Sequence, residues 1–480
     1  MPHRSYQSRS VKQVFLAEQI ALLTGGDLCG DGSVRVTGPA VLDSRKVVPG
    51  ALFVAIKGEH TDGHEYAATA IAAGAALVLG SVPVPGIPMV VVPDVERALG
   101  QLAKAHLAHL RETGDIKVIA ITGSVGKTTT KDLIGQILST KGPTVVPAGS
   151  FNNELGLPLT VLEAGPQTAY LVAEMGASAP GDLTYLTDIA PPDVALVLVV
   201  GQAHLGGFGA IEDVASTKAE LVAGLLPTGT AVLNADDLRV IAMASKAPGQ
   251  VITYGSVTGT TFQATNTSIN DRGQISADVI HRDDLGQAQS AHIDLQLVGE
   301  HHLTNALAAL SACAAVGVPV AESAAILSSA PVLSPHRMAV TDRPDGVTII
   351  DDSYNANPDS MRAALKALAV IAGRKRRTIA VLGEMRELGP DSRQHHDDIG
   401  RLVVRLNISL LVVVGAGATG FADGAQHEGS WGDEVIVFDT IEQAQAFLDV
   451  EITPGDVVLV KSSNGSGLWR LADQLVAKAA

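Results

Sequence analysis

The chain has 480 residues, of which 46% are hydrophobic and 3% aromatic, and its formal net charge is -16. At roughly 150 residues per domain, this length predicts about three domains, each with enough apolar residues for a core. The acidic balance argues against non-specific nucleic-acid binding, which needs many Lys and Arg contacts with phosphate.

The first part of the chain mixes short helices and short strands. The apolar pattern predicts helices over residues 14–26, 64–74 and 101–114, and strands over 51–58, 75–80 and 89–94. The last of these helices ends at a glycine, which marks a plausible boundary. We therefore expect a smaller N-terminal α/β domain over residues 1–113.

A second unit begins with an apolar run at 117–123 that enters a glycine loop and a predicted helix over 128–142. Short β-branched runs alternate with helical stretches up to residue 237, which favours a mainly parallel sheet. The polar segment 251–294 is interpreted as an antiparallel excursion or insertion, and a long helix follows over 302–319. We expect a central P-loop parallel-sheet ATPase domain over residues 114–333.

The last part repeats an open α/β pattern. Five strand-like runs, with helices between most of them, lie at 347–358, 377–385, 410–417, 434–439 and 456–463. This alternation predicts a C-terminal Rossmann-like domain over residues 334–480. The fold class expected for the whole chain is therefore α/β with three domains.

The bulk features also bear on the setting of the protein. Two cysteines, Cys29 and Cys313, are too few for a disulfide framework or a zinc cluster, which fits a reducing compartment. Lys12 and Glu18 interrupt any apolar leader, and no segment reaches about 18 uninterrupted apolar residues. We expect no signal peptide, no membrane span and a cytoplasmic protein.

The stretch ITGSVGKTTT, residues 121–130, has the features of a phosphate-binding loop. An apolar strand enters and a helix leaves, so backbone N–H groups and the helix N-terminus face an anion. Lys127 can reach the β- and γ-phosphates, and Thr128 can place its hydroxyl on Mg²⁺. Ile121 stands where the general pattern has glycine. The alternative is a glycine turn that only joins a strand to a helix.

This short form of the loop resembles the ATP loop of the Mur ligase family, whose members extend the UDP-linked peptide precursor of the bacterial cell wall. Further segments resemble motifs of the same family between about residues 14 and 465: DSRKVVPGALF (43–53), NNELGLP (152–158), GEHHLTN (299–305), DDSYNANPDSM (351–361) and GEMRELG (383–389). The stretch at 351–361 is similar to the branch of the family that attaches D-alanyl-D-alanine.

The resemblance implies an ATP-dependent, Mg²⁺-requiring peptide ligase of peptidoglycan synthesis. Its partners would be UDP-N-acetylmuramoyl-tripeptide, activated as an acyl phosphate, and D-alanyl-D-alanine, with no nucleic acid and with a monomeric chain. A related ligase that adds one amino acid, and a non-ligating P-loop NTPase switch, are the alternatives. Whether the third residue of the tripeptide is diaminopimelate or lysine stays open.

The resemblance also implies roles for individual residues. ATP would be bound by Gly123, Ser124, Val125, Gly126, Lys127, Thr128, Thr129, Asn305, Arg337 and Asp352. Mg²⁺ would be held by Thr128, Glu174, His204 and Lys218, the last as a carbamate. Lys127, Lys218 and His204 would be the catalytic residues. The UDP precursor would be bound by Ser44, Arg45, Gly58, His64, Asn152 and Asn153, and the dipeptide by Tyr354, Asn355 and Asn357.

Some of these assignments have a structural alternative. For Glu174 the alternative is a buried or capping carboxylate, for His204 a structural loop histidine, and for Lys218 a solvated helix lysine. The pair Asn152–Asn153 reads as a helix cap and turn. The chain also departs from the family pattern, with His302 in place of Asn and with His336 and Ser462 in place of Gly.

Overall fold

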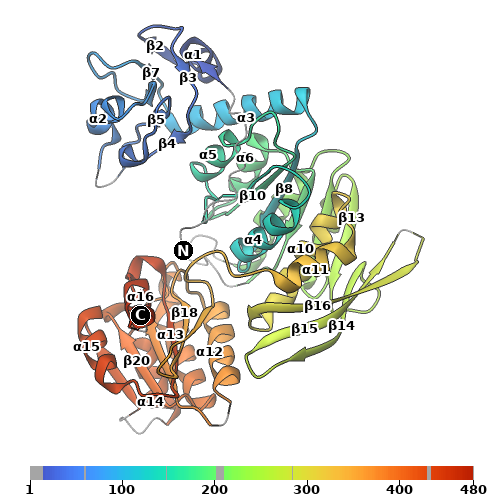
Figure 1. Ribbon diagram of the computed structural model, residues 1–480, viewed down its shortest axis with the longest axis vertical. Coiled ribbons are helices and arrows are strands. Elements are labelled where there is room, and N and C mark those ends of the chain that lie inside the picture. Colours follow the sequence, from blue (N-terminus) through green and yellow to red (C-terminus); the bar gives the residue numbers. More distant parts are fainter. Residues whose placement is uncertain are drawn as a thin grey trace.

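Three lobes follow one another along the chain in the computed structural model, which describes residues 14–58, 61–147, 149–201, 210–283, 285–373, 375–429 and 434–478. Figure 1 shows the N-terminal lobe in blue, the central lobe from cyan to yellow, and the C-terminal lobe in orange and red. Each lobe contains its own sheet, and the expected limits at 113/114 and 333/334 fall between these sheets.

The N-terminal lobe is built on a five-stranded sheet in the order β2-β7-β6-β5-β4, parallel except for β2. A separate antiparallel pair joins β1 to β3. The elements are β1 (Phe15–Leu16), α1 (Ala17–Thr24), β2 (Asp27–Cys29), β3 (Arg35–Val36), β4 (Ala40–Val41), η1 (Ser44–Lys46), β5 (Leu52–Val54), η2 (Gly63–Tyr66), α2 (Ala67–Ala72), β6 (Leu77–Gly80), β7 (Met89–Val91) and α3 (Val95–Thr113).

Helix α3 connects the N-terminal lobe to the central lobe. Asp94 caps its first turn by accepting a hydrogen bond from the Arg97 N–H, and the helix ends before Gly114. Leu99 and Leu102 pack in the core of the N-terminal lobe, whereas Leu107 packs in the core of the central lobe. One continuous helix therefore belongs to two cores.

The central lobe contains a nine-stranded sheet in the order β16-β15-β14-β13-β12-β11-β8-β10-β9. Its elements are β8 (Lys117–Thr122), α4 (Lys127–Leu138), β9 (Thr144–Val145), α5 (Gly156–Leu162), β10 (Tyr170–Glu174), α6 (Asp182–Ile189), β11 (Val194–Val197), α8 (Ile211–Ala223), β12 (Thr230–Asn234), α9 (Leu238–Ile241), η3 (Ala242–Lys246), β13 (Gln250–Gly255), β14 (Phe262–Ile269), β15 (Gln274–Arg282), β16 (Ala288–Val298), α10 (His301–Ala315) and α11 (Val320–Ser329).

Strand β8 lies between β10 and β11 with parallel pairing on both sides, so its carboxyl end opens at the middle of the parallel region. The polar segment 251–294 forms the end of β13 and the antiparallel meander β14–β15–β16. The expected antiparallel excursion is therefore present, and it continues the central sheet.

The C-terminal lobe contains a six-stranded sheet in the order β17-β18-β22-β19-β20-β21, in which only the edge strand β17 is antiparallel. Its elements are β17 (Ala339–Asp342), β18 (Thr348–Asp352), α12 (Pro358–Ala372), β19 (Thr378–Gly383), η4 (Gly389–Asp391), α13 (Ser392–Arg405), β20 (Leu410–Val414), η5 (Ala416–Ala418), α14 (Gly420–Glu428), β21 (Val435–Phe438), α15 (Ile441–Glu451), β22 (Val457–Lys461), η6 (Asn464–Ser466) and α16 (Trp469–Ala477).

The five strand-like runs predicted for this lobe are all strands, and the α/β class expected from the sequence is confirmed. Among the described helices, none has both the length and the apolar character that crossing a membrane requires.

Candidate functional site

The glycine loop lies between the end of β8 and the start of α4. Gly126 has φ 86, in the left-handed region that favours glycine. A Cβ atom at this position would also collide with Oδ1 of Asn305, which reaches the loop from α10. Both the backbone conformation and the approach of Asn305 therefore require glycine here.

Lys127, the first residue of α4, folds back over this loop. Its Nζ donates a hydrogen bond to the carbonyl oxygen of Gly123 at 2.7 Å. Desolvation lowers the pKa of the Lys127 amine, the carboxylate of Glu174 opposes the shift, and the charge of Arg337 adds to it. The lysine thus lies at the N-terminal end of a helix, where backbone N–H groups together with the cations Lys127 and Arg337 favour a phosphate.

A buried carboxylate stands next to the loop at the end of the neighbouring strand. Glu174 ends β10 and is paired in register with Ile121 of β8. Its Oε2 accepts a hydrogen bond from Oγ1 of Thr128 at 3.0 Å, and its Oε1 accepts one from Nδ2 of Asn152 at 2.9 Å. Two of the predicted metal ligands, Thr128 and Glu174, therefore present oxygen atoms side by side, which is the ligand type that Mg²⁺ prefers.

Lys218, predicted as the carbamylated ligand, lies on α8 with only 4% of its surface exposed. Burial, followed by the charge of Lys127, lowers the pKa of its amine to about 7. The alternative of a solvated helix lysine is therefore wrong. Near pH 7 about half of such an amine is neutral, and the neutral form can react with carbon dioxide. His204, the remaining predicted metal ligand, lies outside the described residues.

Arg337 brings a positive charge from the C-terminal part of the chain to the loop. Its Nη2 donates to Oγ1 of Thr128 and to Oγ of Ser150, each at 3.4 Å. The guanidinium lies over the ring of Tyr354, 4.3 Å from the centroid. The structure therefore brings together residues that are 209 positions apart in the sequence.

Asp352, predicted to bind ATP, has partners on both carboxylate oxygens. Oδ2 pairs with Nζ of Lys461 at 2.5 Å, and Oδ1 accepts the backbone N–H of Met338 at 3.1 Å. The same Lys461 amine donates to the carbonyl oxygen of Asn355 at 2.8 Å. Sequence reasoning missed this role of Lys461, although a lysine that ends a buried strand is the available signal.

Several predicted substrate residues hold the local backbone. Asn153 caps the first turn of α5 by accepting the Gly156 N–H, and Asn357 caps α12 by accepting the Ser360 N–H, each at 2.9 Å. The side chain of Asn355 accepts the N–H of the next residue, Ala356. The cap-and-turn alternative therefore describes Asn153 but not Asn152, which contacts Glu174.

Four of the residues predicted to bind the UDP precursor, Ser44, Arg45, Gly58 and His64, lie in the N-terminal lobe, whereas Asn152 and Asn153 lie in the central lobe. His64 is buried, with Nδ1 2.6 Å from Oδ1 of Asp62 and with Nε2 accepting the Ser81 N–H at 2.9 Å. Arg45 follows Ser44 in η1 and has 88% of its side chain exposed, while it pairs with Asp43. The guanidinium is thus open to a ligand, whereas His64 is already bonded internally.

A cavity of about 370 Å³ opens between the central lobe and the C-terminal lobe. Its lining includes His301 of α10, about one helical turn before Asn305, Thr304, which directly precedes Asn305, and Arg362 and Lys366 of α12. The cavity therefore lies at the junction of the two lobes that also contribute Lys127 and Arg337.

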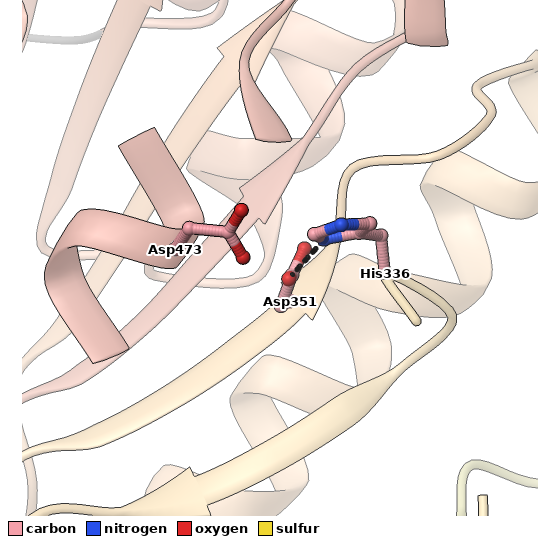
Figure 2. Close-up of side chains that lie close together, drawn as sticks. All are labelled: His336, Asp351 and Asp473. Carbon is pink, nitrogen blue, oxygen red and sulfur yellow. Dashed lines mark hydrogen bonds and ion pairs between the residues drawn. The ribbon is translucent and has the colours of Figure 1, made fainter. Parts of the chain in front are cut away.

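One group of potential metal ligands lies close together among the described residues. Ligand atoms of His336, Asp351 and Asp473 are all within 4.8 Å of one another. Figure 2 shows the carboxylate of Asp351 between the other two side chains, with its hydrogen bond to His336 dashed. None of these three residues belongs to the predicted Mg²⁺ site.

The fold is that of the Mur ligases. The model of the Mur ligase middle domain matches residues 121–313, that of the Mur ligase, glutamate ligase domain matches 336–464, and that of the Mur ligase family, catalytic domain matches 41–107. The chain belongs to the Mur ligase family.

Relatives of this chain carry a more particular name. It is 44% identical to the UDP-N-acetylmuramoyl-tripeptide–D-alanyl-D-alanine ligase of Mycobacterium tuberculosis (strain ATCC 25618 / H37Rv), over 96% of this chain and 97% of the relative. The enzyme of that name from Escherichia coli (strain K12) is 34% identical over 83% and 85% of the two chains.

Solved structures agree with these relatives. A crystal structure of MurF from Acinetobacter baumannii superposes with TM-score 0.84 and 30% identity, over 97% of this chain and 100% of that one. MurF ligase from Thermotoga maritima, solved in complex with ADP, gives TM-score 0.75 and 28% identity over 93% and 99%.

Proposed function

We propose that this chain joins D-alanyl-D-alanine to the terminal carboxylate of UDP-N-acetylmuramoyl-tripeptide, with ATP as the energy source. The chain is 44% and 34% identical, over most of its length, to two relatives that carry this activity in their names, and this similarity supports the proposal. The structural observation that carries it is the contact of Arg337 with Thr128, because it joins the nucleotide loop to the lobe that bears the DDSYNANP stretch. The reaction supplies a peptidoglycan precursor and so serves cell-wall growth, cell shape and division.

The reaction has two chemical steps. A carboxylate oxygen of the tripeptide attacks the γ-phosphorus of ATP, the bond to the β–γ bridging oxygen breaks, and ADP leaves. The free amine of the dipeptide then attacks the carbonyl carbon of the acyl phosphate and loses a proton, and inorganic phosphate leaves with the C–O electron pair. The products are the pentapeptide precursor, ADP and phosphate.

The cations of the site act on the first step. Lys127 and Arg337 lie at the loop from two different lobes, and their charges oppose the negative charge that builds up during phosphoryl transfer. Because the hydrogen bond from Lys127 to Gly123 is local, the amine can exchange this carbonyl for a phosphate oxygen. The remaining loop residues in the proposed ATP set are Ser124, Val125 and Thr129, with Asn305 at the base and Asp352 at the ribose.

Mg²⁺ is the proposed metal, and the oxygen atoms of the described residues at its proposed site suit this ion. The oxygens of Thr128 and Glu174 are adjacent, and Glu174 is 1% exposed, so a cation would balance its charge. A bound Mg²⁺ would neutralise charge on the transferring phosphoryl group. Lys218, as a carbamate, and His204 complete the proposed ligand set.

The substrates are assigned to lobes as follows. Residues 1–113 hold the UDP part, with Ser44, Arg45, Gly58 and His64, and the exposed guanidinium of Arg45 suits a diphosphate. Residues 114–333 hold ATP, and residues 334–480 hold the dipeptide, with Tyr354, Asn355 and Asn357. ATP and a UDP-linked substrate place the reaction in the cytoplasm, and we propose a monomer as the active form.

The test is phosphate release by the purified protein with each substrate omitted in turn. Phosphate should appear at the full rate only with ATP, UDP-tripeptide and D-alanyl-D-alanine together, and mass spectrometry should show the pentapeptide precursor. Preference for a single diaminopimelate or lysine on a UDP-dipeptide would establish the related ligase instead. Undiminished hydrolysis of ATP without any UDP-peptide would establish the NTPase switch.

A further inference from the structure

Arg337 is flanked by two residues with unusual backbone conformations. His336 has φ 58 and Met338 has φ 51, both in the left-handed region. Only a few per cent of non-glycine residues adopt this region, because Cβ comes too close to the following carbonyl oxygen; Asn, Asp and His do so more often than the rest, and Met does not. A chain that holds two such residues around an arginine must stabilise this turn through other contacts.

Two consecutive aspartates at the end of β18 supply these contacts. Nδ1 of His336 lies 2.6 Å from Oδ2 of Asp351, an interaction that is dashed in Figure 2. The Met338 N–H donates to Oδ1 of Asp352 at 3.1 Å. The residue before Arg337 is thus bonded through its side chain, and the residue after it through its backbone.

The turn is also tied to Tyr354. The Tyr354 N–H donates to the carbonyl oxygen of His336 at 3.2 Å, and the ring of the same tyrosine lies under the Arg337 guanidinium. The direction of the arginine is therefore set by its neighbours on both sides and by the ring beneath it. The far end of Arg337 meets Thr128 and Ser150.

We propose that His336 is a positioning residue of the ligase. Its hydrogen bond to Asp351 holds residues 336–338 in the left-handed turn that aims Arg337 at the phosphate loop. The inference rests on the proposed function to the extent that Arg337 acts on ATP. It also explains a histidine where the family pattern has glycine, since glycine adopts the turn without strain whereas histidine needs a bond that retains it.

Substitutions at position 336 separate the effect of the backbone strain from the effect of the side-chain hydrogen bond. His336→Ala introduces strain without a bond, His336→Gly removes the strain and the bond together, and His336→Asn tolerates positive φ and offers an amide donor to Asp351. We expect kcat/KM for ATP to fall about 10- to 100-fold in His336→Ala, because small displacements of a charged group at a phosphate are costly. The asparagine variant should recover most of this loss, and the glycine variant should lie between the two.

Asp473 offers the matched control, because it completes the three-residue group but is exposed. Asp473→Asn should leave kcat/KM unchanged, whereas Asp351→Asn should resemble His336→Ala. If Asp473→Asn lowers activity as Asp351→Asn does and also abolishes Mn²⁺ binding measured by electron paramagnetic resonance, the three residues form a metal site and the proposal is overturned.

A double-mutant comparison excludes a merely structural effect. In the Arg337→Ala background, His336→Ala should change kcat/KM no further, since the histidine acts through the arginine. Additive losses, or full activity of folded His336→Gly, would overturn the proposal. Equilibrium ATP affinity, measured by calorimetry on the same variants, should weaken in parallel even without the UDP-peptide. Failure of the ligase assay alone therefore counts against the proposed function and not against this inference.

Discussion

Asp352 and Lys461 form a buried ion pair at the ends of adjacent parallel strands, with 2.5 Å between Oδ2 and Nζ. The lysine side chain is 1% exposed and the aspartate side chain 11%. Burial lowers the pKa of the lysine amine, and the carboxylate of Asp352 opposes this shift. The pair joins strands β18 and β22 at the edge from which residues 353–358 leave the sheet.

Breaking this pair should destabilise the C-terminal lobe. Lys461→Met leaves a buried carboxylate without its cation, for which we expect a loss of about 3–5 kcal/mol in the free energy of unfolding. Both tryptophans of the chain, Trp431 and Trp469, belong to residues 334–480, so tryptophan fluorescence in denaturant follows this lobe.

The control is the ion pair of Arg393 and Asp423, in which the arginine side chain is 83% exposed. Arg393→Ala should cost no more than about 1 kcal/mol. The double variant Asp352→Asn/Lys461→Met should lose less than the sum of the single variants. Equal losses for the buried pair and the exposed pair would contradict the prediction.

Lys127→Ala should nearly abolish ligation. The transferring phosphoryl group would lose a cation at the N-terminal end of α4, and we expect kcat to fall about 100- to 1,000-fold. Phosphate release at saturating ATP measures the loss. Lys141→Ala is the matched control, because this lysine lies just beyond the other end of α4 and pairs with Glu322. Wild-type turnover by Lys127→Ala would exclude the proposed role.

Lys218 should carry a carbamate. Only the neutral amine reacts with carbon dioxide, and with a pKa of about 7 the neutral fraction is already large at pH 7.0. Nuclear magnetic resonance in ¹³C-bicarbonate should show a carbamate signal that Lys218→Ala lacks. This variant should be inactive, and formate or acetate should partly restore it. A fully active Lys218→Ala would remove the assignment.

The same lysine should make stability depend on pH. Its pKa lies near 7 in the folded chain and near 10.5 in the unfolded chain. Between these values the unfolded chain holds a proton that the folded chain has released, so the free energy of unfolding rises with pH. In buffers without carbon dioxide and divalent metal, Lys218→Met should show a shallower rise over this window. Parallel curves for the two proteins would refute the shift.

Glu174→Gln should weaken the use of Mg²⁺. The change keeps the size of the side chain and removes the negative charge; the amide oxygen can still accept from Asn152, and the Thr128 hydroxyl can accept from the amide NH₂ in place of donating to a carboxylate oxygen. The Mg²⁺ concentration for half-maximal ligation should rise about 10- to 100-fold, a range typical of altered metal surroundings. Glu322→Gln, on the surface, should not change it. An unchanged Mg²⁺ requirement in Glu174→Gln would exclude Glu174 as a metal ligand, and only its alternative role as a buried or capping carboxylate would remain.

The local sequence pattern was sufficient to predict much of the fold. The runs at 117–123 and 456–463 are apolar and β-branched, and each became a strand because its neighbours bury it on both faces. Segment 251–294 was harder to interpret, because its many polar residues hide the alternation of buried and exposed positions that is typical of a strand. In β15 the buried residues Ile275, Ala277 and Val279 point to one face, while the residues between them stay partly exposed.

Strand and helix rules predicted only part of the candidate site, and the resemblance to the Mur ligases supplied residues such as Arg337. The loop at 123–129 and the carboxylate that ends β10 follow from strand and helix rules. The contact between Arg337 and Thr128, and the bond between His336 and Asp351, depend on how two lobes pack, which no local pattern contains. Asn357 caps α12 in the structure, as an asparagine at a helix start predicts, and its role toward the dipeptide stays a prediction.

Helix α3 and the short connection at 334–338 determine which lobes we expect to move together and which to move separately. Because α3 contributes to two cores, the first two lobes should behave as one rigid body, whereas a single crossing of the chain leads into the third. Any closing rotation of the third lobe would then pivot near that crossing, where displacement is smallest. Arg337 lies at this pivot and would therefore be displaced little by the rotation. The arginine can then stay directed at the phosphates while the rest of its lobe moves to admit and release the dipeptide.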